Sequence, residues 1–227
     1  MATTTGPRSA GQLALRVAVV EDETLMRTFV GRILDAQQDM RLVAEAADYA
    51  EGRDRLTPGT VDVVVMDVDL GTGNGIALAT AVQRADPHVA ILLLSAQDVL
   101  DLVLAARAGN ARPWSYLSKK SSLDAATLVR AVRGAARGDV VIDPELVERA
   151  QTRAGTPLAG LTAGQVKVLR LAAEGFSNAY IAESLGISPR SVENHLYAIY
   201  RALDVPADTM NPRVAAVLAY VQQTSRY

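Results

Sequence analysis

The sequence predicts an α/β domain built on a doubly wound, five-stranded parallel sheet, followed by a second, all-α domain that contains a helix-turn-helix. Between residues 13 and 137, short runs rich in Val, Leu and Ile alternate with helical patterns, as expected for strands covered on both faces. After residue 160 the strand-like runs stop and only short amphipathic helical patterns follow. A chain of 227 residues is long enough for these two domains.

The elements of the first domain follow from these apolar runs and from the helical patterns between them. We expect strands at 13–20, 41–46, 61–66, 89–94 and 114–117. We expect helices near 24–37, 48–56, 74–85, 98–108 and 121–136. A stretch with two prolines and alternating charges then interrupts the pattern, and it holds at most one helix, over 144–150. The expected division is a flexible tail (1–12), the α/β domain (13–138), a linker (139–158) and the helical domain (159–227).

The helical domain carries clear start and stop signals. Ser177 can cap a helix over 178–185, and Gly186 can end it. Ser188 can cap the next helix, with Pro189 at its first position. Two helices joined by such a short glycine turn predict a helix-turn-helix.

Composition excludes several classes of function. The chain has no cysteine, which removes disulfide frameworks, zinc fingers and thiol catalysis, and its two histidines leave little room for a histidine-rich metal site. The N-terminus is polar, and no stretch approaches the roughly 18 to 20 apolar residues of a membrane span. We therefore expect a cytoplasmic protein with no membrane partner.

Carboxylates follow two of the predicted strands. Glu21 and Asp22 follow the first strand, and Asp67 follows the third. The carboxyl ends of parallel strands meet at one edge of a sheet, so these side chains should converge there. Three carboxylates in one pocket repel one another and need a cation, and oxygen ligands without nearby His or Cys favour Mg²⁺.

A hydroxyl and an amine are expected at the same edge. Ser95 follows the fourth strand, and Lys119 and Lys120 follow the fifth. Each residue alone has a structural explanation, because Ser95 can cap a helix and a lysine can lie at the surface. Together with Asp67, they are the groups that transfer of a phosphoryl group onto a carboxylate requires.

These residues resemble the receiver domain of bacterial two-component response regulators over about the first 138 residues. The matching pieces are VVEDE (19–23), VVVMDVDLGTGNG (63–75), LLLSA (92–96) and YLSK (116–119). The resemblance implies a flavodoxin-like fold and a partner sensor histidine kinase. It implies Asp67 as the phosphoacceptor and Asp22, Asp67, the Asp69 backbone carbonyl and, through a water, Glu21 as Mg²⁺ ligands. It also implies Ser95, Tyr116 and Lys119 as switch residues.

Three features depart from the usual receiver pattern. Gly71 stands where most receivers have proline, in a loop that also contains Gly73 and Gly75. Lys120 stands where proline often follows the lysine, which leaves open which lysine points inward. The segment between residues 109 and 116 is about three residues longer than in common receivers, which bears on switching more than on chemistry.

The helix after the glycine turn has one apolar and one polar face. Its apolar positions are Val192, Leu196, Ile199 and Leu203. The opposite face carries Arg190, Asn194, Tyr197 and Arg201, flanked by Ser191 and Glu193. Arg, Asn and Glu can read bases in the major groove, although such a stripe alone is as readily a solvated helix face. His195 falls toward the core side, which indicates a structural role.

Residues 161–205 resemble the LuxR-type helix-turn-helix of the NarL/FixJ class. Matching residues include Leu161-Thr162, Ser177-Asn178, Ile187-Ser188, Val192 and His195. Glu193 stands where the family usually has lysine. The DNA-binding residues that we expect are Lys167, Asn178, Ser188, Arg190, Ser191, Glu193, Asn194, Tyr197 and Arg201.

The charge distribution bears on how DNA would be bound. The chain has a net charge of -2, but residues 161–227 hold six basic and five acidic side chains. An excess of one positive charge predicts weak DNA binding by a monomer, because neutralisation of phosphates supplies much of the affinity for DNA. A homodimer on a palindromic promoter site would double the contacts. The last helix, opening at Asn211-Pro212, offers a pairing stripe, although the same stripe can equally pack on its own domain: Val214, Val217, Leu218 and Val221.

The sequence therefore predicts a DNA-binding transcriptional regulator controlled by phosphorylation of Asp67, and not an enzyme. A regulator that binds DNA without phosphorylation is the first alternative. The second is a phosphatase, because Asp67-Val68-Asp69 also resembles the start of haloacid-dehalogenase-type enzymes. In that family the Asp-x-Asp strand comes first and the acidic pair last, whereas Glu21 and Asp22 come first here.

Overall fold

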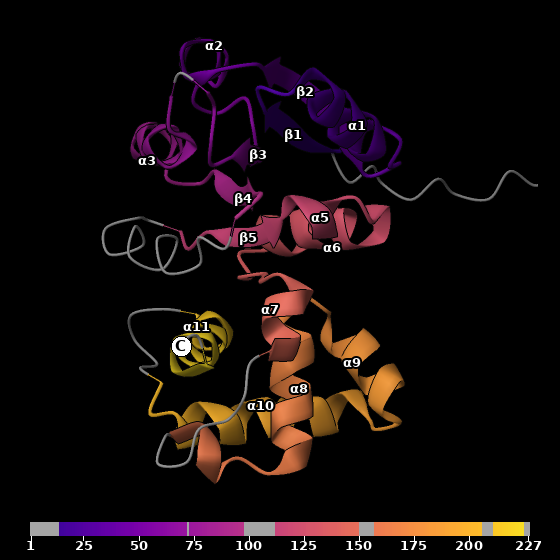
Figure 1. The fold of residues 1–227 in the computed structure, drawn as a ribbon. Coiled ribbons are helices and arrows are strands. Elements are labelled where there is room, and N and C mark those ends of the chain that lie inside the picture. The colour runs from indigo at the N-terminus through magenta and orange to yellow at the C-terminus, as the bar shows by residue number, and fades with distance from the viewer. Residues whose placement is uncertain (1–13, 72, 98–111, 150–156, 206–210, 225–227) are drawn as a thin grey trace, which may run out of the picture.

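The computed structural model describes residues 14–71, 73–97, 112–149, 157–205 and 211–224 (Figure 1). Within these ranges, none of the helices combines the length and the apolar character needed to cross a membrane. The helix expected at 98–108 and the part of the longer 109–116 segment that precedes Arg112 lie outside the described residues.

The predicted parallel sheet is confirmed. Its strands are β1 (Leu15–Val20), β2 (Met40–Ala46), β3 (Val63–Asp67), β4 (Ala90–Ser95) and β5 (Ser115–Ser118), in the order β2-β1-β3-β4-β5. Every adjacent pair is parallel. Val20 pairs with Met66, and Asp67 pairs with Leu94, so the strands that precede the expected site end side by side.

Helices cover both faces of the sheet. The helices are α1 (Thr24–Asp35), α2 (Tyr49–Arg55), α3 (Gly75–Ala85), α5 (Lys119–Ser122) and α6 (Ala125–Ala136). Alternate residues of the central strands point to opposite faces. Val17 and Val65 pack with α1 and α6, whereas Ala18 and Met66 pack with residues of α3.

The single helix expected over 121–136 is wrong. Two helices occupy this stretch, because each has a capping side chain of its own. Ser118 accepts a hydrogen bond from the backbone of Ser121 and caps α5, and Asp124 accepts one from Thr127 and caps α6. Because Ser118 is the cap, α5 begins at Lys119, two residues before the expected start at residue 121.

The first part of the expected linker is packed. Val140, Val141 and Ile142 are all buried, and helix α7 (Pro144–Arg149) follows directly. In Figure 1 this helix lies between β5 and the C-terminal helices. The linker therefore joins the apolar core of one domain to that of the other.

The C-terminal helices are α8 (Ala163–Ala173), α9 (Asn178–Leu185), α10 (Pro189–Ala202) and α11 (Pro212–Thr224), with a short 3₁₀ turn at Pro157–Gly160. The predicted helix starts and the predicted helix end are confirmed. Ser177 and Ser188 cap α9 and α10, and Gly186 ends α9 in the left-handed conformation with φ of 63°. The helix-turn-helix is thus built from local signals.

Candidate functional site

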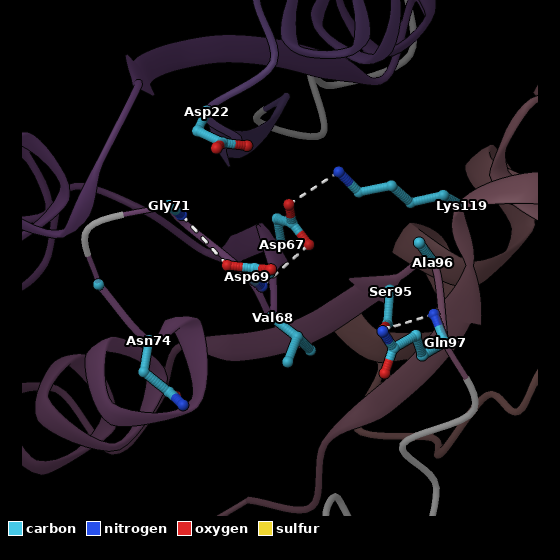
Figure 2. Close-up of a pocket in the computed structure, with 11 residues that line it drawn as sticks. Asp22, Asp67, Val68, Asp69, Gly71, Asn74, Ser95, Ala96, Gln97 and Lys119 are labelled. Carbon is cyan, nitrogen blue, oxygen red and sulfur yellow. Dashed lines mark hydrogen bonds and ion pairs between the residues drawn. The ribbon is translucent and has the colours of Figure 1, made fainter.

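The strand ends bring the expected acidic groups together (Figure 2). Asp67 ends β3, Ser95 ends β4, and Lys119 directly follows β5. Carboxylate oxygens of Glu21, Asp22 and Asp67 all lie within 4.8 Å of one another. They lie at one edge of the sheet, where Asp22, Asp67 and Lys119 line a pocket of about 410 Å³.

Lys119 is the inward lysine. Its ammonium lies 2.7 Å from Asp67 Oδ2 and 2.8 Å from Glu21 Oε1. Lys120 instead has a side chain that is 78% exposed, and it pairs with Glu145 on α7. The question that the sequence left open is decided by α5, since only its first residue reaches over the carboxylates.

Burial and neighbouring charges shift the pKa values of Glu21 and Lys119. Burial raises the pKa of Glu21 to about 7; the hydrogen bond from Lys119 opposes this rise, and the charge of Asp67 adds to it. Burial also acts to lower the pKa of Lys119, but its hydrogen bonds to Asp67 and Glu21 outweigh that effect and raise the pKa. The lysine is therefore a fixed positive charge beside two buried carboxyl groups.

The cluster fits a hard divalent cation. Its donors are carboxylate oxygens, which Mg²⁺ prefers. Glu21 Oε2 is buried and has no hydrogen-bond partner among the described residues. A buried carboxylate oxygen without a donor is costly, and a cation or its bound water would satisfy it.

Gln97 is held at the rim of the pocket by two of the expected switch residues. Ser95 Oγ accepts a hydrogen bond from the Gln97 backbone amide at 3.1 Å. The Tyr116 hydroxyl donates to the Gln97 carbonyl oxygen at 2.8 Å, and its side chain is buried. A movement of Ser95 would therefore act on the same residue that Tyr116 contacts.

The glycine loop after β3 has a backbone that proline could not adopt. Gly71 has a φ of +65°, whereas proline is restricted to about -65°. The Asp69 carboxylate supports the turn by accepting from the Gly71 amide at 3.2 Å, and its own amide donates to Asp67 Oδ1. A Cβ added at Gly75 would stand 1.8 Å from the Asp67 carbonyl oxygen. Two glycines thus shape the backbone around Asp67.

The polar face of α10 is open to solvent. Val192, Leu196 and Ile199 are buried, as the spacing predicts, and Leu203 is half-buried. The residues on the opposite face are exposed: Arg190, Glu193, Asn194, Tyr197 and Arg201. Ser191 is half-buried, while Lys167 on α8 is exposed. His195 is half-buried, and it lies beside Gly164 of α8.

The structure contradicts the pairing face expected on the last helix and supports the alternative, that the apolar stripe packs on its own domain. Val214, Val217 and Leu218 are almost fully buried in the core of their own domain, so they are not available to a second chain. The side chain of Val221 lies outside the described residues. An apolar stripe has the same spacing whether it packs within a domain or between chains, which is why the pattern could not separate the two.

Asn178 and Asp143 have contacts that the sequence did not indicate. Asn178 is half-buried, and its Oδ1 accepts from Arg213 on α11 at 2.8 Å, so the expected DNA contact is engaged within the domain. Asp143 is buried and accepts from the backbone amide of Ser118 at 2.7 Å. Its only sequence signal was its place before Pro144, which is typical of a helix cap.

Models of two known protein families match the two domains of the chain. A model of the response regulator receiver domain matches residues 17–133. A model of bacterial regulatory proteins of the luxR family matches residues 159–215.

Two similar proteins cover most of the chain, and a similar solved structure covers more than half of it. The nitrate/nitrite response regulator protein NarP of Escherichia coli (strain K12) is 32% identical over 213 residues, covering 92% of this chain and 95% of NarP. The oxygen regulatory protein NreC of Staphylococcus carnosus (strain TM300) is 29% identical, and the match covers 84% of this chain and 92% of NreC. A solved structure of a LuxR-family two-component response regulator from Aurantimonas sp. SI85-9A1 is 28% identical with a TM-score of 0.52. The match covers 60% of this chain and 94% of the solved chain. The chain therefore belongs to the NarL/FixJ class of two-component response regulators, with a receiver domain followed by a LuxR-type helix-turn-helix domain.

Proposed function

We propose that Asp67 accepts a phosphoryl group from a phosphohistidine of a partner sensor kinase, and that this modification controls promoter binding by α10. The observation that supports this role is the position of the Lys119 ammonium 2.7 Å from Asp67 Oδ2, beside two further carboxylates.

The proposed domain division is that expected from the sequence, with its linker at 139–158. Since promoter DNA is the proposed target, the protein would act in the cytoplasm.

In the proposed reaction, a carboxylate oxygen of Asp67 attacks the phosphorus atom. The phosphorus–nitrogen bond breaks, its electron pair returns to the imidazole, and an acyl phosphate forms on Asp67. The Lys119 ammonium neutralises part of the charge of about -1.5 to -2 that the new group adds. When bound by Asp22, Asp67, the Asp69 carbonyl and, through water, Glu21, Mg²⁺ would supply further charge stabilisation for the phosphoryl oxygens.

The switch is proposed to start at Ser95. Its hydroxyl turns toward a phosphoryl oxygen and gives up the hydrogen bond from the Gln97 amide. Gln97 then shifts, and the Tyr116 hydroxyl that donates to its carbonyl follows. The only new contact that this order of events needs is the one between Ser95 and the phosphoryl group.

A peptide digest tests the phosphoacceptor directly. The full chain is incubated with acetyl phosphate and Mg²⁺, and the peptide that contains Asp67 is analysed by mass spectrometry at acid pH. We expect one added phosphoryl group in the wild type and none in Asp67→Asn. Phosphate on another residue, or steady release of phosphate from a generic phosphomonoester, would overturn the assignment. The matched families are those of regulators and give no support to the phosphatase alternative.

The exposed polar face of α10 is the proposed DNA-reading surface. Arg190 can read guanine, Asn194 can read adenine, and Glu193 can accept from cytosine. Lys167, Ser188, Ser191 and Arg201 are proposed to contact phosphates, and Tyr197 a base or sugar. In this protein Asn178 would act by holding Arg213 rather than by reaching DNA.

Alanine substitution tests this face. The probe is a duplex recovered by in vitro selection with the full chain. Arg190→Ala should weaken specific binding by about 1 to 3 kcal/mol, roughly five- to 150-fold, because a bidentate base contact is lost. Arg53→Ala is the matched control, since Arg53 is equally an exposed helical arginine but lies on the receiver. Equal affinity for Arg190→Ala and Arg53→Ala would exclude α10 as the reading helix.

We also propose that the active form is a homodimer, because the helical domain carries few basic groups. Sedimentation of the full chain with beryllofluoride and Mg²⁺, which together mimic the phosphoryl group, should show a dimer on the selected duplex. One chain per duplex under saturating conditions would contradict this.

A further inference from the structure

The outer edge of β5 is closed by the segment that leads to the DNA-binding domain. β5 is an edge strand, so half of its backbone amides face away from the sheet. Two of these amides have partners in this segment. The Tyr116 amide donates to the Val141 carbonyl at 2.8 Å, and the Ser118 amide donates to Asp143 Oδ2 at 2.7 Å.

Asp143 occupies a special position on this edge. Its side chain is buried, and its two oxygens accept from two different backbone amides. One is Ser118, the residue that directly precedes Lys119. The other is Glu145, at 2.8 Å, in the first turn of α7. The carboxylate therefore ties the root of the Lys119 side chain to the start of α7.

The same segment is bonded to the DNA-binding domain. The Ile142 amide, one residue before Asp143, donates to the Ala173 carbonyl at the end of α8 at 2.8 Å. Further along, the Tyr220 hydroxyl of α11 donates to the Val147 carbonyl of α7 at 3.3 Å. A displacement of β5 at Ser118 would thus reach α8 through a path of two residues, Asp143 and Ile142.

We propose that Asp143 is a positioning residue that couples the state of the phosphorylation site to the DNA-binding domain. This inference rests on the proposed function. Phosphorylation changes the partners of Lys119, which now holds Asp67 and Glu21. The resulting shift at the end of β5 passes through the Ser118 amide to Asp143, and from there to α8. Other contacts also join the two domains, such as the hydrogen bond from Arg130 Nε of α6 to the Glu174 carbonyl at 3.1 Å, so the loss of the Asp143 bond should weaken the coupling.

The variant Asp143→Asn tests the coupling with little change in shape. A carboxylate can accept with both oxygens, whereas an amide presents one acceptor and one donor. Asp143→Asn therefore keeps at most one of the two bonds to backbone amides. The matched control is Asp124→Asn, because the Asp124 carboxylate also accepts from a backbone amide in the first turn of a helix, but it is exposed and lies in the receiver at the start of α6.

The measured quantity is the ratio of Kd values for the selected duplex without and with beryllofluoride. Couplings of this kind are typically about 5- to 150-fold, and we expect a ratio in this range for the wild type and for Asp124→Asn. For Asp143→Asn we expect the ratio to fall at least about fivefold toward 1, while the rate of phosphorylation by acetyl phosphate is unchanged. A wild-type ratio in Asp143→Asn would overturn this inference alone. A ratio of 1 in the wild type would overturn the proposed function as well.

Amide hydrogen exchange in the wild type gives a second test that needs no variant to fold. The amides of Ser118 and Ile142 are on the proposed path, whereas the amide of Leu42 bonds to Asp35 far from it. We expect beryllofluoride to change the exchange of Ser118 and Ile142 together and to leave Leu42 unchanged. Unaltered exchange at Ile142 when Ser118 responds would contradict the coupling.

Discussion

Gly175→Ala tests the packing between the two domains. The side chain of Val141 lies between two glycines, one from each domain: a Cβ on Gly134 of α6 would be 2.6 Å from Val141 Cγ2, and one on Gly175 would be 2.7 Å from it. Gly175 also has a φ of +82°. An alanine there carries left-handed backbone strain of about 1 to 2 kcal/mol, plus overpacking of about 1 to 3 kcal/mol. We expect a total loss of about 2 to 5 kcal/mol in the free energy of unfolding.

Gly186→Ala separates the two contributions. Gly186 also has a positive φ, of 63°, but no atom lies within 4 Å of its added Cβ. It should therefore lose only the backbone part, about 1 to 2 kcal/mol. The difference between the two variants measures the contact with Val141.

A double-mutant cycle with Val141→Ala completes the test. Removing the valine methyl groups makes room for the new alanine, so the combined loss should be smaller than the sum by about 1 to 3 kcal/mol. The assay is urea unfolding of the full chain, followed by circular dichroism. Additivity within about 0.5 kcal/mol, with Gly175→Ala no worse than Gly186→Ala, would refute the packing of Val141 between the domains.

Three further predictions concern local contacts. The hydrogen bond from Arg16 lowers the pKa of Asp62, so their pair stabilises the fold above the ordinary carboxyl pKa of about 4 and is lost as pH falls below it. Because both side chains are more than a third exposed, Asp62→Asn should cost only about 0.5 to 1 kcal/mol at pH 7 in urea unfolding, with the difference vanishing near pH 2; a constant difference would contradict the sign. Gly75→Ala should cost about 2 to 4 kcal/mol and slow phosphorylation by acetyl phosphate, because its Cβ would meet the Asp67 carbonyl; wild-type values for both would contradict the close approach. Ser188→Ala should cost about 1 kcal/mol, since the cap of α10 is lost, and an unchanged melting temperature would argue against that cap.

Local patterns predicted most of the fold because the relevant interactions are local. The buried strands are continuous apolar runs, and Ser177, Gly186 and Ser188 act on their own helix ends. The break between α5 and α6 was missed because it depends on competition between two capping residues, Ser118 and Asp124, along one continuous helical pattern.

The sequence predicted the part of the site that is formed by the ends of the parallel strands. It did not predict the contacts between residues that are far apart in the chain and lie outside the strands. Parallel strands bring Glu21, Asp67 and Lys119 together, whichever loops connect them. The choice of Lys119 over Lys120 depended on where α5 begins. The role of Asp143 depends on the linker lying along β5, a contact over 25 residues that no local pattern records.

The central claim is that the state of Asp67 controls DNA affinity. The most direct measurement is the Kd of the full chain for its selected duplex by fluorescence anisotropy, at one salt concentration, with and without beryllofluoride and Mg²⁺. We expect an affinity change of about 5-fold or more in the wild type and no change in Asp67→Asn. Equal affinities of the wild type under both conditions would contradict the account.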